Sequence, residues 1–134
     1  MIITYFQNQA VTLTYEPEWH LGTARIEGFL SSQQFRETIS RGIRLLEEYK
    51  PLRWLSDNRK MKVIRQSDQE WYMAHALPQI LESTIRRNAI IVSEDIFNKM
   101  AVEQLVKRAG HLEGMLLQEF NEEWQALAWL KQPL

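Results

Sequence analysis

The stretch between Trp54 and Trp71 holds most of the side chains in this sequence that could do chemistry. A short apolar run ends at Asp57, a basic segment follows, and a helical pattern begins at Ser67. In α/β proteins, ligands commonly bind where a strand ends and the amide groups of a helix N-terminus attract negative charge. The candidate binding residues are Asp57, Arg59, Lys60, Lys62, Arg65 and Ser67.

These residues have functional and structural interpretations. Asp57 and Arg59 could orient a ligand or partner, or they could have a structural role, by pairing with each other or by capping the loop. The structural interpretation is favoured. The basic segment could bind an anion or be a solvated loop, and it has no glycine-rich cradle for a phosphate. Ser67 and Glu70 have the spacing of a capping box, which explains both residues without a reaction.

The sequence lacks the usual patterns of catalysis and metal binding. It has no cysteine, so thiolate catalysis and zinc–thiolate sites are excluded. His20, His75 and His111 fall in different predicted elements, without His-x-x-x-His spacing. His75, near a buried helix face, is predicted to be a packing residue, and no G-x-S-x-G motif occurs. We therefore predict a protein that is not an enzyme, with no metal and no cofactor.

Length and composition predict one soluble domain that covers residues 1–134. The chain is 45% hydrophobic and 25% charged, with a formal net charge of -1. That charge argues against general nucleic-acid binding, which needs a basic surface. No apolar run is long enough to span a membrane, and the first residues lack the pattern of a signal peptide. A cytoplasmic location is the expectation.

The first half of the chain has the pattern of three strands followed by a helix. Residues 2–6, 11–15 and 20–29 alternate between apolar and polar side chains, which predicts an antiparallel meander. Ser31 and Gln34 form a capping box at the start of a helix that Pro51 ends. The predicted buried stripe of that helix is Phe35, Ile39, Ile43, Leu46 and Tyr49.

Strands and helices alternate in the second half. Strands are predicted at residues 53–56, 88–93 and 115–120, and helices after Ser67, Asp95 and Asn121. Pro78 should kink the first of these helices, and Gly110 should end the second. The predicted buried residues are Trp71, Ala74, Leu77 and Leu81 in the first helix, Phe97, Met100, Ala101 and Leu105 in the second, and Trp124, Leu127 and Ala128 in the last.

The order βββ-αβ-αβ-αβ-α predicts the α/β fold class. Alternating units imply right-handed crossovers, so we expect a single mixed, mostly parallel sheet with an N-terminal antiparallel hairpin and helices packed on it. Leu55, Ile90, Ile91 and Leu117 should be buried in this sheet, because strands covered on both faces need no polar side.

Four local segments carry a resemblance to a known family. They read G-F-L-S-S-Q-Q-F at 28–35, W-L-S-D-N-R at 54–59, S-D-Q-E-W at 67–71 and A-I-I-V-S-E-D-I-F-N-K-M-A at 89–101. With the element order, they make the chain resemble small, stand-alone bacterial proteins of the SpoIIAA-like group in the STAS superfamily. The resemblance implies a sheet backed by helices that acts through protein contacts. Regulatory members carry a phosphorylatable serine, and Ser67 is the nearest hydroxyl, although the adjacent serine and glycine of that motif are absent.

Two functional hypotheses follow. The first is a non-catalytic regulatory or protein-interaction module, whose partner is another protein or a second copy in a homodimer. Trp129, off the main stripe of the last helix, is a candidate interface residue. Trp19, at a hairpin tip, is the second candidate interface residue if it is exposed, and a core residue if it is folded back.

The alternative is a carrier or sensor of a small apolar or anionic ligand, held between helices and sheet; some relatives resemble apolar-ligand carriers. A large apolar cavity with few polar groups would favour the carrier, and a filled core with an exposed apolar patch would favour the interaction module.

Overall fold

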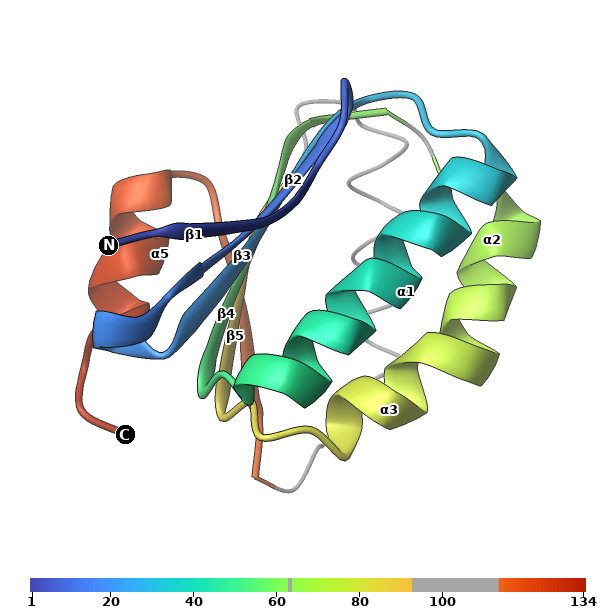
Figure 1. Cartoon of the computed structure of the whole chain (residues 1–134). Coiled ribbons are helices and arrows are strands. Elements are labelled where there is room, and N and C mark those ends of the chain that lie inside the picture. Colours follow the sequence, from blue (N-terminus) through green and yellow to red (C-terminus); the bar gives the residue numbers. More distant parts are fainter. Residues whose placement is uncertain (63, 93–113) are drawn as a thin grey trace.

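The computed structural model shows one sheet with helices on both faces (Figure 1). It describes residues 1–62, 64–92 and 114–134. The helix predicted after Asp95, with its buried stripe, Gly110 and His111, lies outside the described residues.

Six described strands form the sheet, and their order across the sheet is their order along the chain. The first three pair antiparallel, and β3–β4, β4–β5 and β5–β6 pair parallel. The predicted α/β class and the N-terminal hairpin are confirmed. The strands are β1 (Ile3–Gln7), β2 (Val11–Glu16), β3 (Leu21–Gly28), β4 (Arg53–Met61), β5 (Arg87–Ile91) and β6 (Leu116–Phe120).

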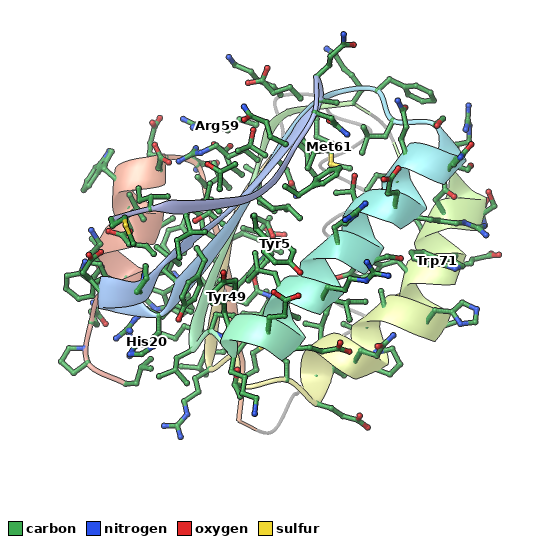
Figure 2. All side chains as sticks on the ribbon, viewed as in Figure 1. Tyr5, His20, Tyr49, Arg59, Met61 and Trp71 are labelled. Atoms are coloured by element: carbon green, nitrogen blue, oxygen red, sulfur yellow. The ribbon has the colours of Figure 1, made fainter. Side chains whose placement is uncertain are left out.

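Helix α1 (Ser32–Tyr49) begins at the predicted capping box. The Gln34 backbone amide donates to Ser31 Oγ, and the Gln34 side chain accepts from the Ser31 amide. At the other end of the helix, Tyr49 stacks on Tyr15 with ring centroids 4.7 Å apart and meets the edge of Tyr5 at 6.0 Å. These aromatic contacts fasten α1 to the hairpin (Figure 2).

Strand β4 is longer than the predicted residues 53–56, because it pairs with β3 as far as Met61 opposite Gly28. Asp57, Arg59 and Lys60 therefore lie inside a central strand and not in a loop after it. Charged side chains are tolerated there because alternate residues of a strand face opposite sides of the sheet. Each of these side chains finds an ionic partner.

The predicted capping box at Ser67 is wrong. Helix α2 (Gln66–Trp71) begins one residue before Ser67, and its N-cap Arg65 makes no side-chain capping bond. Ser67 and Glu70 are both exposed. The side chain of Asp68, one residue further on, is instead turned toward α1, where it accepts a hydrogen bond from Ser32 Oγ at 2.9 Å.

Pro78 interrupts the second helical segment, as predicted. A π-helical turn, η2 (Tyr72–Ala76), joins α2 to α3 (Leu77–Leu81). A π-turn adds a residue to one helical turn and so rotates the face that follows it. Ala76 and Leu77 consequently face inward, whereas Ala74 and His75 are exposed, contrary to their predicted burial.

The sheet separates two hydrophobic cores. On the α1 side, the core joins the hairpin, α1 and Trp54. On the other side, Leu55, Ala89 and Ile91 pack against α5 (Glu123–Leu130), and the short helix η1 (Pro17–Trp19) lies beside it (Figure 1). Burial of Leu55 and Ile91 is confirmed, but Ile90 and Leu117 are only half-buried.

The predicted face of the last helix is wrong. Ala126 and Leu130 are the buried residues of α5, whereas Trp124 and Ala128 are exposed. Small Ala126 lets the helix approach the sheet closely, and Leu130 lies one turn further on the same face. The predicted cap also differs, since the N-cap is Glu122, which makes no side-chain capping bond.

Candidate functional site

The charged cluster, formed by Arg25, Asp57, Arg59 and Glu123, joins the sheet to the start of α5. Asp57 accepts hydrogen bonds from Arg59 Nε at 2.9 Å and from Arg59 Nη2 at 2.7 Å, and Arg25 pairs with it from β3. Arg25 also pairs with Glu123 in the first turn of α5. The predicted pairing of Asp57 with Arg59 is thus present, with two further members.

The electrostatics of the cluster keep Asp57 ionised. Burial acts to raise the pKa of the Asp57 carboxyl, but hydrogen bonds from Arg59 and the positive charges of Arg59 and Arg25 outweigh it. The net result is a pKa below the usual range. Hydrogen bonding to Asp57 raises the pKa of Arg59 in turn. Each charge therefore has an opposite charge beside it, which is the arrangement of a structural ion-pair network.

The other predicted site residues do not join this cluster. Lys60 lies 3.8 Å from Glu27 in an exposed pair. Arg65 lies over the ring of Phe29, 4.9 Å from its centroid, and donates to Ser32 Oγ. Lys62 follows β4, and Ser67 lies on the exposed face of α2. The predicted basic segment is thus spread over separate surfaces, and anion binding by it stays a prediction.

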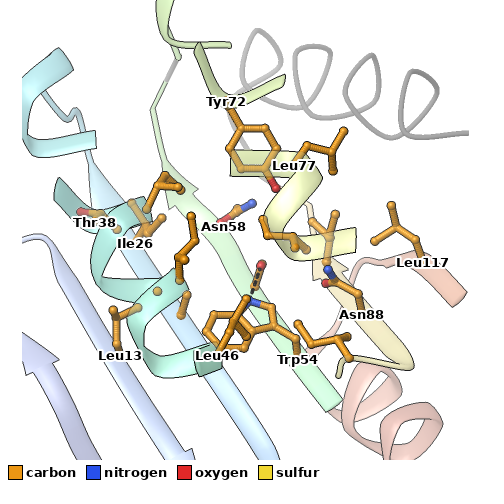
Figure 3. Close-up of a pocket in the computed structure, with 18 of the residues that line it drawn as sticks. Leu13, Ile26, Thr38, Leu46, Trp54, Asn58, Tyr72, Leu77, Asn88 and Leu117 are labelled. Carbon is orange, nitrogen blue, oxygen red and sulfur yellow. Dashed lines mark hydrogen bonds between the residues drawn. The ribbon is translucent and has the colours of Figure 1, made fainter. Parts of the chain in front are cut away.

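A cavity lies between the sheet and the helices α1, η2 and α3 (Figure 3). Its volume is about 150 Å³. The floor comes from side chains of β2 to β6 that face α1, and the walls come from the helices. The indole of Trp54 lies directly over Gly22, where any Cβ would collide with it. The apolar lining includes Leu13, Ile26, Phe35, Ile39, Leu46, Trp54, Leu77, Ile80, Ile90 and Leu117.

A few polar groups interrupt this lining. Asn58 of β4 and Asn88 of β5 turn toward the cavity from its floor, and the hydroxyl of Tyr72 points in from η2 (Figure 3). Trp54 Nε1 donates to Ser56 Oγ at 3.2 Å, so the indole N–H is already used. Burial raises the pKa of Tyr72 to about 12, so this phenol is neutral at physiological pH.

The two asparagines of the floor differ in their surroundings. Asn58 is 9% exposed. Asn88 Oδ1 is buried and has no hydrogen-bond partner among the described residues. Apart from neutral Tyr72, no ionisable side chain stands among the described lining residues.

The candidate-site prediction missed the cavity residues. The sequence feature that could have indicated Asn88 is its polar side chain directly before the apolar run Ala89–Val92. Asn58 was hidden inside a charged segment, and Gly42 lay within a helical pattern. Assigning these residues to a cavity requires the packing of three helical segments on the sheet, which the pattern of one chain does not specify.

Both tryptophans predicted as interface residues pack within their own chain. The ring of Trp129 lies 5.5 Å from that of Phe120 and also 5.5 Å from the Arg87 guanidinium. Trp19 contacts the same core and lies beside Arg53 and Lys131. Arg87 also donates a hydrogen bond to the Trp129 carbonyl at 2.7 Å. Trp129 is half-buried by these contacts, and an interface at this residue stays a prediction.

Within the described residues, no group of three or more histidine, aspartate or glutamate side chains could hold a metal ion. None of the described helices is long and apolar enough to cross a membrane.

One solved structure shows which fold this is. A crystal structure of an uncharacterised protein from Shewanella loihica PV-4, of the DUF3478 family and with a SpoIIAA-like fold, superimposes with a TM-score of 0.54. The match covers 93% of this chain and 98% of that chain at 14% identity. The chain has a SpoIIAA-like fold. No family model and no curated protein matches the sequence.

Proposed function

We propose that this SpoIIAA-like domain binds a small, mostly apolar ligand in the cavity under α1, as a carrier or sensor. The cavity itself is the supporting observation. An apolar cavity of about 150 Å³ is large enough to bind benzene. A bound apolar ligand would bury its surface against this lining, and burial contributes roughly 25 cal/mol per Å² of apolar area.

Gly42 allows this proposal to be tested without damaging the fold. It lies in the middle of α1 and lines the cavity, and a Cβ added there would meet no atom within 4 Å. A glycine inside a helix costs about 1 kcal/mol relative to alanine. Gly42→Leu should therefore occupy part of the cavity while leaving stability equal to or above that of the wild type.

The experiment is calorimetric titration with toluene as the probe, together with thermal unfolding with and without toluene. We expect the wild type to bind and to melt at a higher temperature with toluene, and Gly42→Leu to lose both effects. Gly42→Ala controls for helix propensity, and Ser40→Leu adds the same side chain at an exposed position of α1. Unchanged binding by Gly42→Leu, or no binding by the wild type, would contradict the proposal.

The proposed role is binding without catalysis. Support comes from the Asp57 carboxylate, which already pairs with two arginines, and from the uncharged lining of the cavity. Assays with generic ester, phosphate and peptide substrates should show no turnover. Turnover that copurifies with the protein and disappears in Asp57→Asn would contradict this expectation.

A regulatory or protein-interaction module is the second candidate. The observation in its favour is Trp124, whose side chain is 68% exposed on α5. Self-association through this surface would appear in sedimentation at micromolar concentration and would weaken in Trp124→Ser. A monomeric wild type would contradict self-association through this surface.

A further inference from the structure

We propose that the cavity selects a neutral ligand whose polar end both donates and accepts hydrogen bonds, and that Asn88 recognises that end. The inference rests on the proposed function and goes further, because it specifies the polar group of the ligand and the residue that recognises it. An amide or a hydroxyl on an apolar body has the required chemistry.

The carboxamide of Asn88 provides the first part of the argument. Asn88 stands on the cavity floor opposite Trp54 in the parallel register, and its Oδ1 is buried with no hydrogen-bond partner among the described residues. A buried polar group without a hydrogen bond costs about 1–3 kcal/mol. A carboxamide offers one acceptor oxygen and two donor hydrogens, and rotation about its last torsion is soft. A ligand group that donates and accepts can therefore satisfy the Asn88 side chain.

The absence of charge among the described lining residues provides the second part. An ionised ligand would leave its water shell without meeting an opposite charge there, and such burial is far more costly than burial of a neutral polar group. The described arginines close to the sheet already have partners elsewhere. Arg25 and Arg59 pair on the α5 side, and Arg53 donates to carbonyl oxygens at the end of α5. The cavity therefore favours a neutral ligand over the anionic ligand that the sequence left open.

Three molecules of similar size test separately the effect of the polar group and the effect of charge on binding. Toluene has no polar group, benzamide has a neutral group that donates and accepts, and benzoate is an anion at pH 7. Calorimetric titration of the wild type at pH 7 should show binding of toluene and benzamide, and affinity for benzoate at least about tenfold lower than for benzamide. Benzoate binding as tightly as benzamide would overturn the inference.

The residue is tested by Asn88→Leu, with the exposed Asn121→Leu as the matched control. Asn88→Leu should reduce the ratio of benzamide affinity to toluene affinity by about tenfold, the value of one hydrogen bond, and Asn121→Leu should leave it unchanged. An unchanged ratio in Asn88→Leu would overturn the assignment of this residue.

A purely structural role for Asn88 predicts a different result. In that case Asn88→Leu would melt at a lower temperature without ligand and keep the selectivity of the wild type. On our inference, the ligand-free variant melts at or above the wild-type temperature, because it no longer buries an unpaired oxygen. If toluene binds while the ratios do not change, only this inference fails. If none of the three molecules binds, the proposed function fails as well.

Discussion

Asp57 is a buried charged side chain held by two arginines. It is 7% exposed, lies between two guanidinium groups and connects β3, β4 and the first turn of α5 through them. The pattern of residues predicted its pairing with Arg59, because the two are adjacent on one face of a segment. It did not predict Arg25 or Glu123, which are far away in the chain and arrive only when the sheet and α5 assemble.

Asp57→Asn should lower the free energy of unfolding by about 2 kcal/mol, because charged hydrogen bonds are lost and two arginines remain without their carboxylate. The folded-state pKa of Asp57 lies below its unfolded value. Its contribution is therefore complete above the unfolded pKa of about 4 and disappears as the pH falls through the folded pKa.

Urea unfolding at pH 7 and at a series of values below pH 4 measures both effects. The difference between wild type and Asp57→Asn should be largest at pH 7 and should shrink in acid. A difference independent of pH would show that the charge of Asp57 does not stabilise the fold.

Ser67→Ala, unlike Asp57→Asn, should have little effect on stability. A capping serine would cost about 1 kcal/mol on replacement by alanine. Ser67 is exposed inside α2 and caps nothing, so the substitution should change stability by less than about 0.5 kcal/mol. Thermal unfolding decides between the two values, and a loss near 1 kcal/mol would restore the capping interpretation.

Among the elements, the junction of α1 and α2 depends on one buried carboxylate. Asp68 is 1% exposed and accepts from Ser32 Oγ at 2.9 Å, and Arg36 Nε lies 3.6 Å from its other oxygen. The contact brings the start of α2 against the start of α1, at one side of the cavity wall. The sequence patterns of α1 and α2 predicted the approximate positions of both helices. The contact between Asp68 and Ser32 could not be predicted, because it depends on how the two helices pack against each other.

Asp68→Asn and Ser32→Ala should be coupled. Each should destabilise the fold by about 1–3 kcal/mol, and the double variant should cost less than the sum, because both remove one hydrogen bond. Urea unfolding of the four proteins gives the coupling energy. Ser40→Ala, at an exposed site on the same helix, is the control, and additive costs would show that the contact contributes little.

Element boundaries were predicted best where one local rule decides them. The Ser31–Gln34 capping box and Pro51 bound α1 as expected. The predicted length of β4 was too short. Its second half contains polar residues, which usually indicate the end of a strand, but pairing with β3 keeps these residues in the sheet. The faces of η2 and α5 were wrong for a similar reason: a π-turn and the fit of Ala126 against the sheet depend on packing, which overrides periodicity.

For the whole molecule, the strand order decides where a ligand can bind. Open α/β sheets usually bind ligands in the crevice where the strand order reverses. The order of the six described strands never reverses, so these strands form no such crevice. The expectation of a site at the carboxyl end of a central strand assumed that crevice. The cavity lies instead beneath the helices on one face.

Core integrity is tested by Ile91→Asp. Ile91 is completely buried on β5. The free-energy cost of burying an unpaired carboxylate there exceeds the free energy of unfolding of a domain of this size. The variant should be unfolded by circular dichroism at 25 °C. Leu116→Asp, on the adjacent strand at a side chain that is 61% exposed, should fold and melt near the wild type. A cooperative melt of Ile91→Asp would contradict the assigned register.

The sequential strand order also has a consequence for folding kinetics. Each described strand from β2 onward pairs with the strand that immediately precedes it in the chain. A growing chain on the ribosome can therefore add each strand to an edge that has already been synthesised, without waiting for a later segment to be inserted between two others. Loop closure for each addition spans only the intervening connection, and its entropic cost rises slowly with length. This sheet can therefore assemble in the direction of translation, from the hairpin toward α5.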